Sequence, residues 1–275
     1  MPLSVNTNLA SLTAQRSLSS SQSTLETAFE RLSTGKRINS AADDAAGLAI
    51  SQTLTSKVNG LNQAIRNSND GISVVQIAEG ALDEVTTILQ RMRDLAVQAA
   101  NDSLSTTERG YLQTEHGKLA DALDDVAGAA KFGSTALLSG SFTAKSFQVG
   151  ADSGDTLSFS IDGISTGALN VSSSGDVSLS SAAVASAAIG TIDAALNAVA
   201  ADRAALGAIQ SQFESTVRNL ANIAENTAAA RGRILDTDYA AETANLTKAQ
   251  ILQQASTAIL AQANAQPQSV LSLLQ

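Results

Sequence analysis

Few residues in this 275-residue chain have the types and spacing that a catalytic or ligand-binding site requires. Gly35-Lys36 is similar to the end of a phosphate-binding loop, but the earlier glycine of that motif is absent and no apolar strand leads into it. We therefore interpret this pair as a turn that ends a helix. His116 is the single histidine and the chain has no cysteine, so a typical zinc site or a catalytic triad finds no partners, and we expect His116 to be exposed on a helix.

The acidic clusters also lack the spacing of paired catalytic acids. Asp43-Asp44 and Asp124-Asp125 are adjacent residues, so their side chains diverge on a helix, and we interpret them as solvated or as complementing a helix dipole. Residues 236–238, Asp-Thr-Asp, lack the glycine and the distal glutamate of a calcium loop. The sequence therefore predicts that the protein is not an enzyme and has no catalytic residue, no cofactor and no metal site.

The composition favours long packed helices. Hydrophobic residues make up 44% of the chain and aromatic residues only 3%, so the apolar side chains are mainly Ala, Leu, Val and Ile. The formal net charge is -9 and Lys and Arg form no stripe, which disfavours nucleic acid as a partner. No continuous apolar run reaches the length of a membrane span, and the first residues lack the pattern of a cleaved Sec signal peptide. We expect neither a membrane nor a nucleic acid as a partner.

Both ends of the chain have helical periodicity but very little charge. The first 25 residues hold one charged side chain, and residues 249–275 hold none. A helix with one face in water would normally carry charge there, so we expect the terminal helices to pair with each other and to be enclosed by further protein. The residues that we expect to mediate subunit assembly are Leu18, Leu25, Phe29, Leu32, Leu252, Ile259, Val270 and Leu273.

The region between the ends reads as helices interrupted by one insert. Apolar stripes predict a long helix through residues 74–99, another through 111–126, and a third that begins near Ala182. We expect the first helix of the chain to end at Gly35, and Asp236 or Thr237 to cap the last one.

The insert covers about residues 132–180 and is rich in Gly, Ser and Thr. Leu157, Phe159 and Ile161 alternate with polar residues, and Phe147 with Val149 lies across the glycine-rich residues 150–155, so we predict a small β-hairpin.

The predicted fold class is mainly α. Long antiparallel helices form a coiled-coil-like bundle, the N- and C-terminal helices pair, and the β-hairpin insert lies in the centre of the chain. We expect a terminal helical domain made of residues 1–42 and 234–275, and a helical middle domain made of residues 43–233.

Several long motifs, in this order, resemble those of bacterial flagellin. They are LSTGKRINSAADDAAG (32–47), LQRMRDLAVQ (89–98), KAQILQQ (248–254) and VLSLL (270–274). The resemblance covers roughly residues 1–140 and 185–275. It implies a structural subunit that polymerises into the extracellular flagellar filament, the propeller for swimming, with terminal helices that line an inner tube and a short centre that faces solvent.

The resemblance also implies partners and a second site. The chain would be exported through the flagellar type III apparatus, without a cleaved Sec signal, and would meet an export chaperone, the filament cap protein and hook-junction proteins. An animal Toll-like flagellin receptor would contact Arg91, Leu95, Gln98 and Glu115, which occupy the matching positions. Leu95 also continues a sevenfold row of apolar residues, so it can equally be core, and Arg91 and Gln98 can equally be a solvated or subunit-contacting face.

Two alternatives remain open at this point. A flagellar hook-filament junction protein would share the flagellin-like ends. A secreted coiled-coil translocon protein that inserts its ends into membranes would need a polar face rich in Lys and Arg on its terminal helices, and these helices have little charge.

Overall fold

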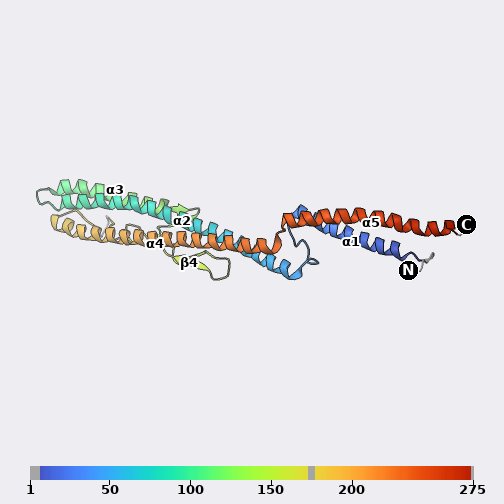
Figure 1. Ribbon diagram of the computed structural model, residues 1–275. Helices are drawn as coiled ribbons and strands as arrows, with labels where there is room; N and C mark the ends of the chain where they lie inside the picture. Colours follow the sequence, from blue (N-terminus) through green and yellow to red (C-terminus); the bar gives the residue numbers. More distant parts are fainter. Residues whose placement is uncertain (1–6, 173–176, 274–275) are drawn as a thin grey trace. The chain divides into compact units, whose positions relative to one another are not determined.

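The computed structural model describes residues 7–172 and 177–273, with side chains up to Gln266. The chain forms two compact units, which we call the terminal unit (Met1–Val58 with Glu225–Gln275) and the middle unit (Asn59–Ala224). In chain order the elements are α1 Leu9–Thr34, α2 Ala45–Ala99, α3 Thr106–Ala129, β1 Lys131–Phe132, β2 Thr135–Ala136, β3 Lys145–Gln148, β4 Thr156–Phe159, α4 Ala182–Leu235 and α5 Tyr239–Leu273 (Figure 1).

The predicted fold class is confirmed, because long helices dominate and the described strands form only two small antiparallel pairs. The unit boundaries differ from the predicted ones at residues 42/43 and 233/234. The sequence places the boundaries near the ends of the predicted helices. In the structure the boundaries fall within helices, because the first turns of α2 and the last turns of α4 belong to the terminal unit.

In the terminal unit α1 and α5 run antiparallel and approach closely along their lengths (Figure 1). Asn8 donates from Nδ2 to the carbonyl oxygen of Ala263 at 2.7 Å, and Arg31 lies opposite Glu242 at the other end of the pair. Small residues at sevenfold spacing form the buried seam, which permits this close approach. They are Ala14, Ser21 and Ala28 on α1, and Ala249, Ser256 and Ala263 on α5.

Backbone hydrogen bonds join the segment that follows α1 to the segment between α4 and α5. Gly35 ends α1 in the left-handed conformation at φ 69°, as predicted. The Arg37 amide donates to the Leu235 carbonyl at 2.7 Å, and the Thr237 amide donates to the Gly35 carbonyl at 3.0 Å. Asp238 caps α5 by accepting from the Ala240 amide at 2.9 Å, so the predicted caps Asp236 and Thr237 are wrong by one or two residues.

In the middle unit α2 and α4 are antiparallel. Arg93 pairs with Asp193 at 2.6 Å and Asp83 pairs with Arg203 at 3.0 Å, so residue numbers rise on one helix as they fall on the other. The core between the helices is built from larger aliphatic residues, all fully or almost fully buried. It includes Leu82, Leu89, Met92, Leu123, Ile192, Val199 and Leu206.

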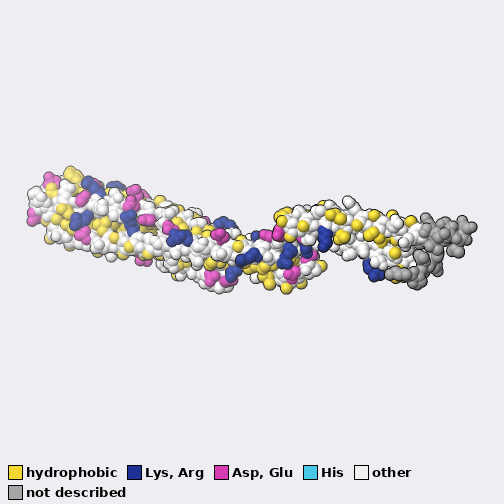
Figure 2. Space-filling model, viewed as in Figure 1, with side chains coloured by type: hydrophobic (Ala, Val, Ile, Leu, Met, Phe, Trp, Pro, Cys, Tyr) yellow, Lys and Arg dark blue, Asp and Glu magenta, His cyan; other side chains and the backbone are white. Residues whose placement is uncertain are grey.

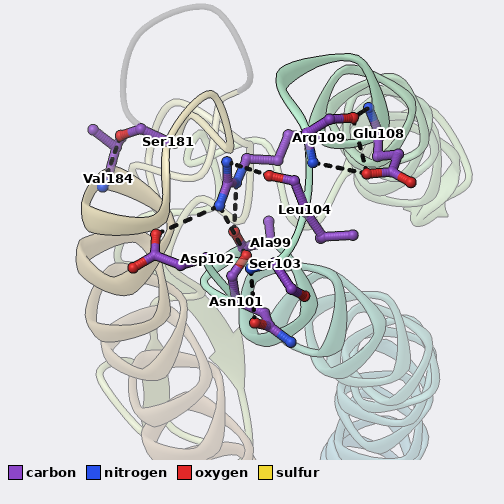
Figure 3. A network of polar contacts seen from close by, with 10 residues as sticks. Ala99, Asn101, Asp102, Ser103, Leu104, Glu108, Arg109, Ser181 and Val184 are labelled. Carbon is purple, nitrogen blue, oxygen red and sulfur yellow. Dashed lines mark hydrogen bonds and ion pairs between the residues drawn. The ribbon is translucent and has the colours of Figure 1, made fainter.

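The turn from α2 into α3 is held by one buried arginine (Figure 3). Arg109 donates to the carbonyl oxygens of Ala99, Leu104 and Asn101 at 2.8 to 2.9 Å. Ser105 and Glu108 form a reciprocal capping box at the start of α3. Together these bonds satisfy the backbone groups that a helix end would otherwise leave unpaired.

The predicted hairpin is confirmed. β3 pairs with β4 in the register Phe147 opposite Leu157. Phe147 and Phe159 stack with ring centroids 5.4 Å apart, and both rings meet the edge or face of Phe213 from α4. The hairpin therefore packs on the helices of the middle unit through an aromatic cluster. A second strand pair, β1 with β2, follows α3 and is not predicted by the sequence.

Candidate functional site

The residues predicted for assembly are divided by the structure into two groups. Leu18, Leu25 and Leu32 are half-buried beside the small-residue seam. The larger side chains on the other faces are exposed: Phe29 by 51%, Leu252 by 46% and Ile259 by 58%. The side chains of Val270 and Leu273 lie outside the described residues.

A two-helix pair can bury only a narrow strip of each helix, and here the strip is made of Ala and Ser. The terminal unit therefore leaves further large apolar side chains in water, which the heptad analysis missed because they lie off its apolar rows. They include Leu9 and Leu12 on α1 and Ile251 on α5.

One side of α5 is a shallow apolar groove. Its walls are Ala244, Thr247, Lys248, Ile251 and Leu252. Lys248 is the single charged side chain in these walls, so what the groove chiefly offers a partner is apolar burial. Figure 2 shows hydrophobic and uncharged side chains covering much of the α1–α5 pair, whereas both signs of charge are interspersed over the helices of the middle unit.

The predicted receptor-contact residues lie on α2 and α3 of the middle unit. Arg91 bonds from Nε to Oε1 of Glu115 at 3.0 Å, and both side chains are about half exposed. Gln98 is exposed on α2. Leu95 is only 1% exposed, because it faces the core between the helices. The structure thus brings three of the four residues to the surface and places the fourth beneath them.

The first acidic pair, Asp43 and Asp44, organises the backbone at the start of α2. Asp43 accepts from the Ser40 and Asn39 amides, and these hydrogen bonds lower the pKa of the Asp43 carboxyl. Asp44 accepts from the Gly47 amide at 2.9 Å and so caps α2. Among the described residues no group of three or more His, Cys, Asp or Glu could hold a metal ion.

Asp124 anchors the chain after the hairpin. Its carboxylate accepts from the amide and the hydroxyl of Thr166 at 2.8 and 2.9 Å. Asp124 is exposed, as a solvated residue would be, but its hydrogen bonds with Thr166 are not predicted by the sequence.

His116 is buried, and the prediction that it is exposed is wrong. Its position carried a signal, since it lies four residues after Leu112 and three before Leu119 on the apolar stripe of α3. The buried stripe of α3 consists of Arg109, His116, Ala120, Leu123 and Ala127.

Within the described part of the chain one helix, α4, is apolar and long enough to span a membrane when judged by length and composition, with a mean hydropathy of 1.5 over 18 residues. The sequence predicts no such stretch, because polar residues such as Asp193 interrupt every continuous apolar run. The same helix supplies Ile192 and Val199 to the core of the middle unit.

Comparisons with known proteins agree with this architecture. The model of the bacterial flagellin N-terminal helical region matches residues 5–143, and that of the C-terminal helical region matches residues 189–274. Flagellin B of Vibrio cholerae is 38% identical with complete coverage of both chains, and a flagellin of Halalkalibacterium halodurans is 42% identical over 98% of this chain and 99% of its own.

Solved structures point the same way. The crystal structure of Bacillus cereus flagellin is 30% identical, covers 60% of this chain and 94% of its own, and superposes with a TM-score of 0.50. Both ends of the chain match the same family in sequence, and 60% of the chain superposes on a solved flagellin structure. The chain therefore belongs to the bacterial flagellin family.

Proposed function

We propose that this chain is the structural subunit of a bacterial flagellar filament and that copies assemble through the terminal unit. The observation that carries the proposal is the division of apolar residues on α1 and α5. Small residues make the contact inside one subunit, while Phe29, Ile251 and Ile259 stay exposed. Burying such surface between copies would stabilise the polymer by roughly 25 cal/mol per Å² of apolar area.

The proposed contact is between different surfaces of neighbouring copies. A contact of this kind does not close on itself and therefore generates an extended polymer rather than a dimer. The near absence of charge on α5, which carries only Glu242 and Lys248, suits a helix that is enclosed by other copies.

Family membership extends the proposal to location and partners. We propose that the chain works outside the cell, after export by the flagellar type III apparatus, and contacts hook-junction proteins and the filament cap. An export chaperone would cover the apolar side of α5 before assembly, since Ile251 and Leu252 would otherwise favour premature association.

We also propose a contact for an animal Toll-like flagellin receptor on α2 and α3. The exposed residues Arg91, Gln98 and Glu115 would form it. Leu95 would not touch the receptor, because its side chain is buried, but would support the exposed residues by packing beneath them.

The two alternatives have less support. A hook-associated protein of Vibrio parahaemolyticus is similar in structure, but its 17% identity speaks for the fold alone. A membrane-inserting role would need a basic polar face on the terminal helices. On α5 a single basic residue, Lys248, faces the apolar groove.

The proposal is tested by a charge placed on the exposed face of α5. Purified Ile259→Asp protein is mixed with filament fragments as seeds and viewed by negative-stain microscopy. We expect no elongation, because a carboxylate would be buried between copies. Ser153→Asp, which adds the same charge at the exposed hairpin turn, should elongate normally. Full elongation by Ile259→Asp would argue that this face of α5 is not a subunit contact.

A further inference from the structure

The buried imidazole of His116 has no visible structural purpose. The side chain is 0% exposed on α3, and within the described part of the chain neither Nδ1 nor Nε2 has a hydrogen-bond partner. A buried polar group without a partner normally costs stability, and most such groups in proteins are satisfied. An aliphatic residue would fill an apolar helix stripe without this cost.

The charged side chains that lie near His116 along α3 bind other groups. On α3 itself Glu115 bonds to Arg91 of α2 at the surface, and Lys118 bonds to Asp121. One heptad earlier, the guanidinium of Arg109 is directed to backbone carbonyls.

A charged pair also joins the two neighbouring helices. Arg93 of α2 pairs with Asp193 of α4. The segment before α4 packs on α3 through the Leu179 amide, which donates to Gln113 Oε1 at 2.6 Å, and its residues 177–181 are uncharged. Among the described residues burial is the one cause that shifts the pKa of His116, and it lowers that pKa because the buried imidazolium would lose its hydration.

We infer that His116 is an acid-sensitive element of the middle unit: the folded core excludes the proton that the unfolded chain accepts, so mild acid loosens the packing of α3 against α2 and α4. The terminal unit has no histidine that could respond in the same pH range, because His116 is the only histidine of the chain. The subunit would be stable at neutral pH and would weaken as pH falls through the histidine range, before most carboxylates titrate.

The sign follows from proton linkage. An unfolded histidine titrates near pH 6.5, whereas the folded His116 has a lower pKa, so below about pH 6.5 the unfolded state binds more protons. Stability is therefore complete above that pH and is lost as pH falls towards the folded pKa. The folding equilibrium constant should drop by up to about tenfold for each pH unit in that window.

Three full-length proteins test the inference in monomeric form, by thermal unfolding followed with far-UV circular dichroism between pH 7.5 and 5.0. They are the natural chain, His116→Leu and Leu123→Ala. The natural chain should melt at a progressively lower temperature below about pH 6.5, and His116→Leu should lose this dependence. Leu123→Ala removes a neighbouring buried side chain of α3, so it should melt lower at every pH but keep the dependence of the natural chain.

A second measurement does not depend on how the variants fold. Because there is one histidine, the imidazole C–Hε1 proton gives one NMR resonance for the folded protein and needs no further assignment. In the folded chain this resonance should not titrate near pH 6.5, and it should change only as the unfolded signal appears. Titration of the folded resonance with a midpoint at or above 6.5 would overturn the inference, as would an unchanged pH dependence in His116→Leu.

Discussion

Arg109 Nε donates to the carbonyl oxygen of Ala99 at 2.9 Å, so a side chain at the start of α3 caps the last turn of α2. The same guanidinium also reaches the carbonyls of Leu104 and Asn101, and it is almost fully buried (Figure 3). The turn between the two helices is therefore fixed by a planar group that presents several donors at once.

Arg109→Lys should not replace this function, because an ammonium group cannot direct donors along three separate directions in the same plane. We expect both Arg109→Lys and Arg109→Ala to lower the free energy of unfolding, the alanine variant by about 2–3 kcal/mol. Urea unfolding followed by circular dichroism measures this. An Arg109→Lys protein as stable as the natural chain would show that the charge, rather than the geometry, matters.

Two glycines of α2 should respond in opposite directions to alanine. A Cβ at Gly71 would lie 2.6 Å from the ring of Phe213, whereas a Cβ at Gly80 would meet nothing within 4 Å. Gly71→Ala should therefore cost about 1–3 kcal/mol through overpacking of the aromatic cluster. Gly80→Ala should stabilise by up to about 1 kcal/mol, because glycine disfavours the helix interior. Thermal unfolding of both variants tests the pair, and a stabilised Gly71→Ala protein would contradict the packing of Phe213.

In the proposed receptor contact, the role of an exposed residue can be distinguished from that of a buried one by mutation. Arg91→Ala monomer should keep its fold, since the Arg91–Glu115 pair is solvent-exposed, but should lose receptor activation in a reporter-cell assay. Leu95→Ala should instead lower the free energy of unfolding by about 2–5 kcal/mol, because Leu95 is buried. Arg66→Ala, another exposed arginine of α2, is the matched control and should signal normally. Unchanged signalling by Arg91→Ala would reject this receptor contact.

Hydrophobic periodicity alone predicts most of the helices and the hairpin. Gly35 as the end of α1, Ala182 as the start of α4 and a hairpin that turns within residues 150–155 follow directly from residue type and spacing. Each of these features is determined by residues that are close in sequence, so a local pattern of apolar and turn-forming residues is enough to predict it.

The features that the sequence does not predict depend on contacts between distant segments. On α1 the seam uses Ala14 and Ala28, whereas periodicity gives more weight to Leu18, Leu25 and Leu32 beside them. Small residues define the seam because they allow the closest approach of two helices, which is a tertiary effect.

The same limit explains His116. Its place on the α3 stripe is visible in the sequence, but the enclosure of that stripe depends on α2 and on the segment before α4. We expected an exposed side chain from the residue type, but the position of His116 on the buried stripe determines its exposure.

The central claim, that copies assemble through the terminal unit, is tested most directly by deleting residues 249–275. This removes most of α5, including Ile259 and the small-residue seam on that helix, and leaves every residue of the middle unit in place. Seeded polymerisation of the truncated and the full-length protein is followed by negative-stain microscopy, with circular dichroism as the measure of folding. We expect the truncated chain to keep the cooperative unfolding of its middle unit and to form no filaments. Filaments of normal length and diameter from the truncated chain would contradict the claim.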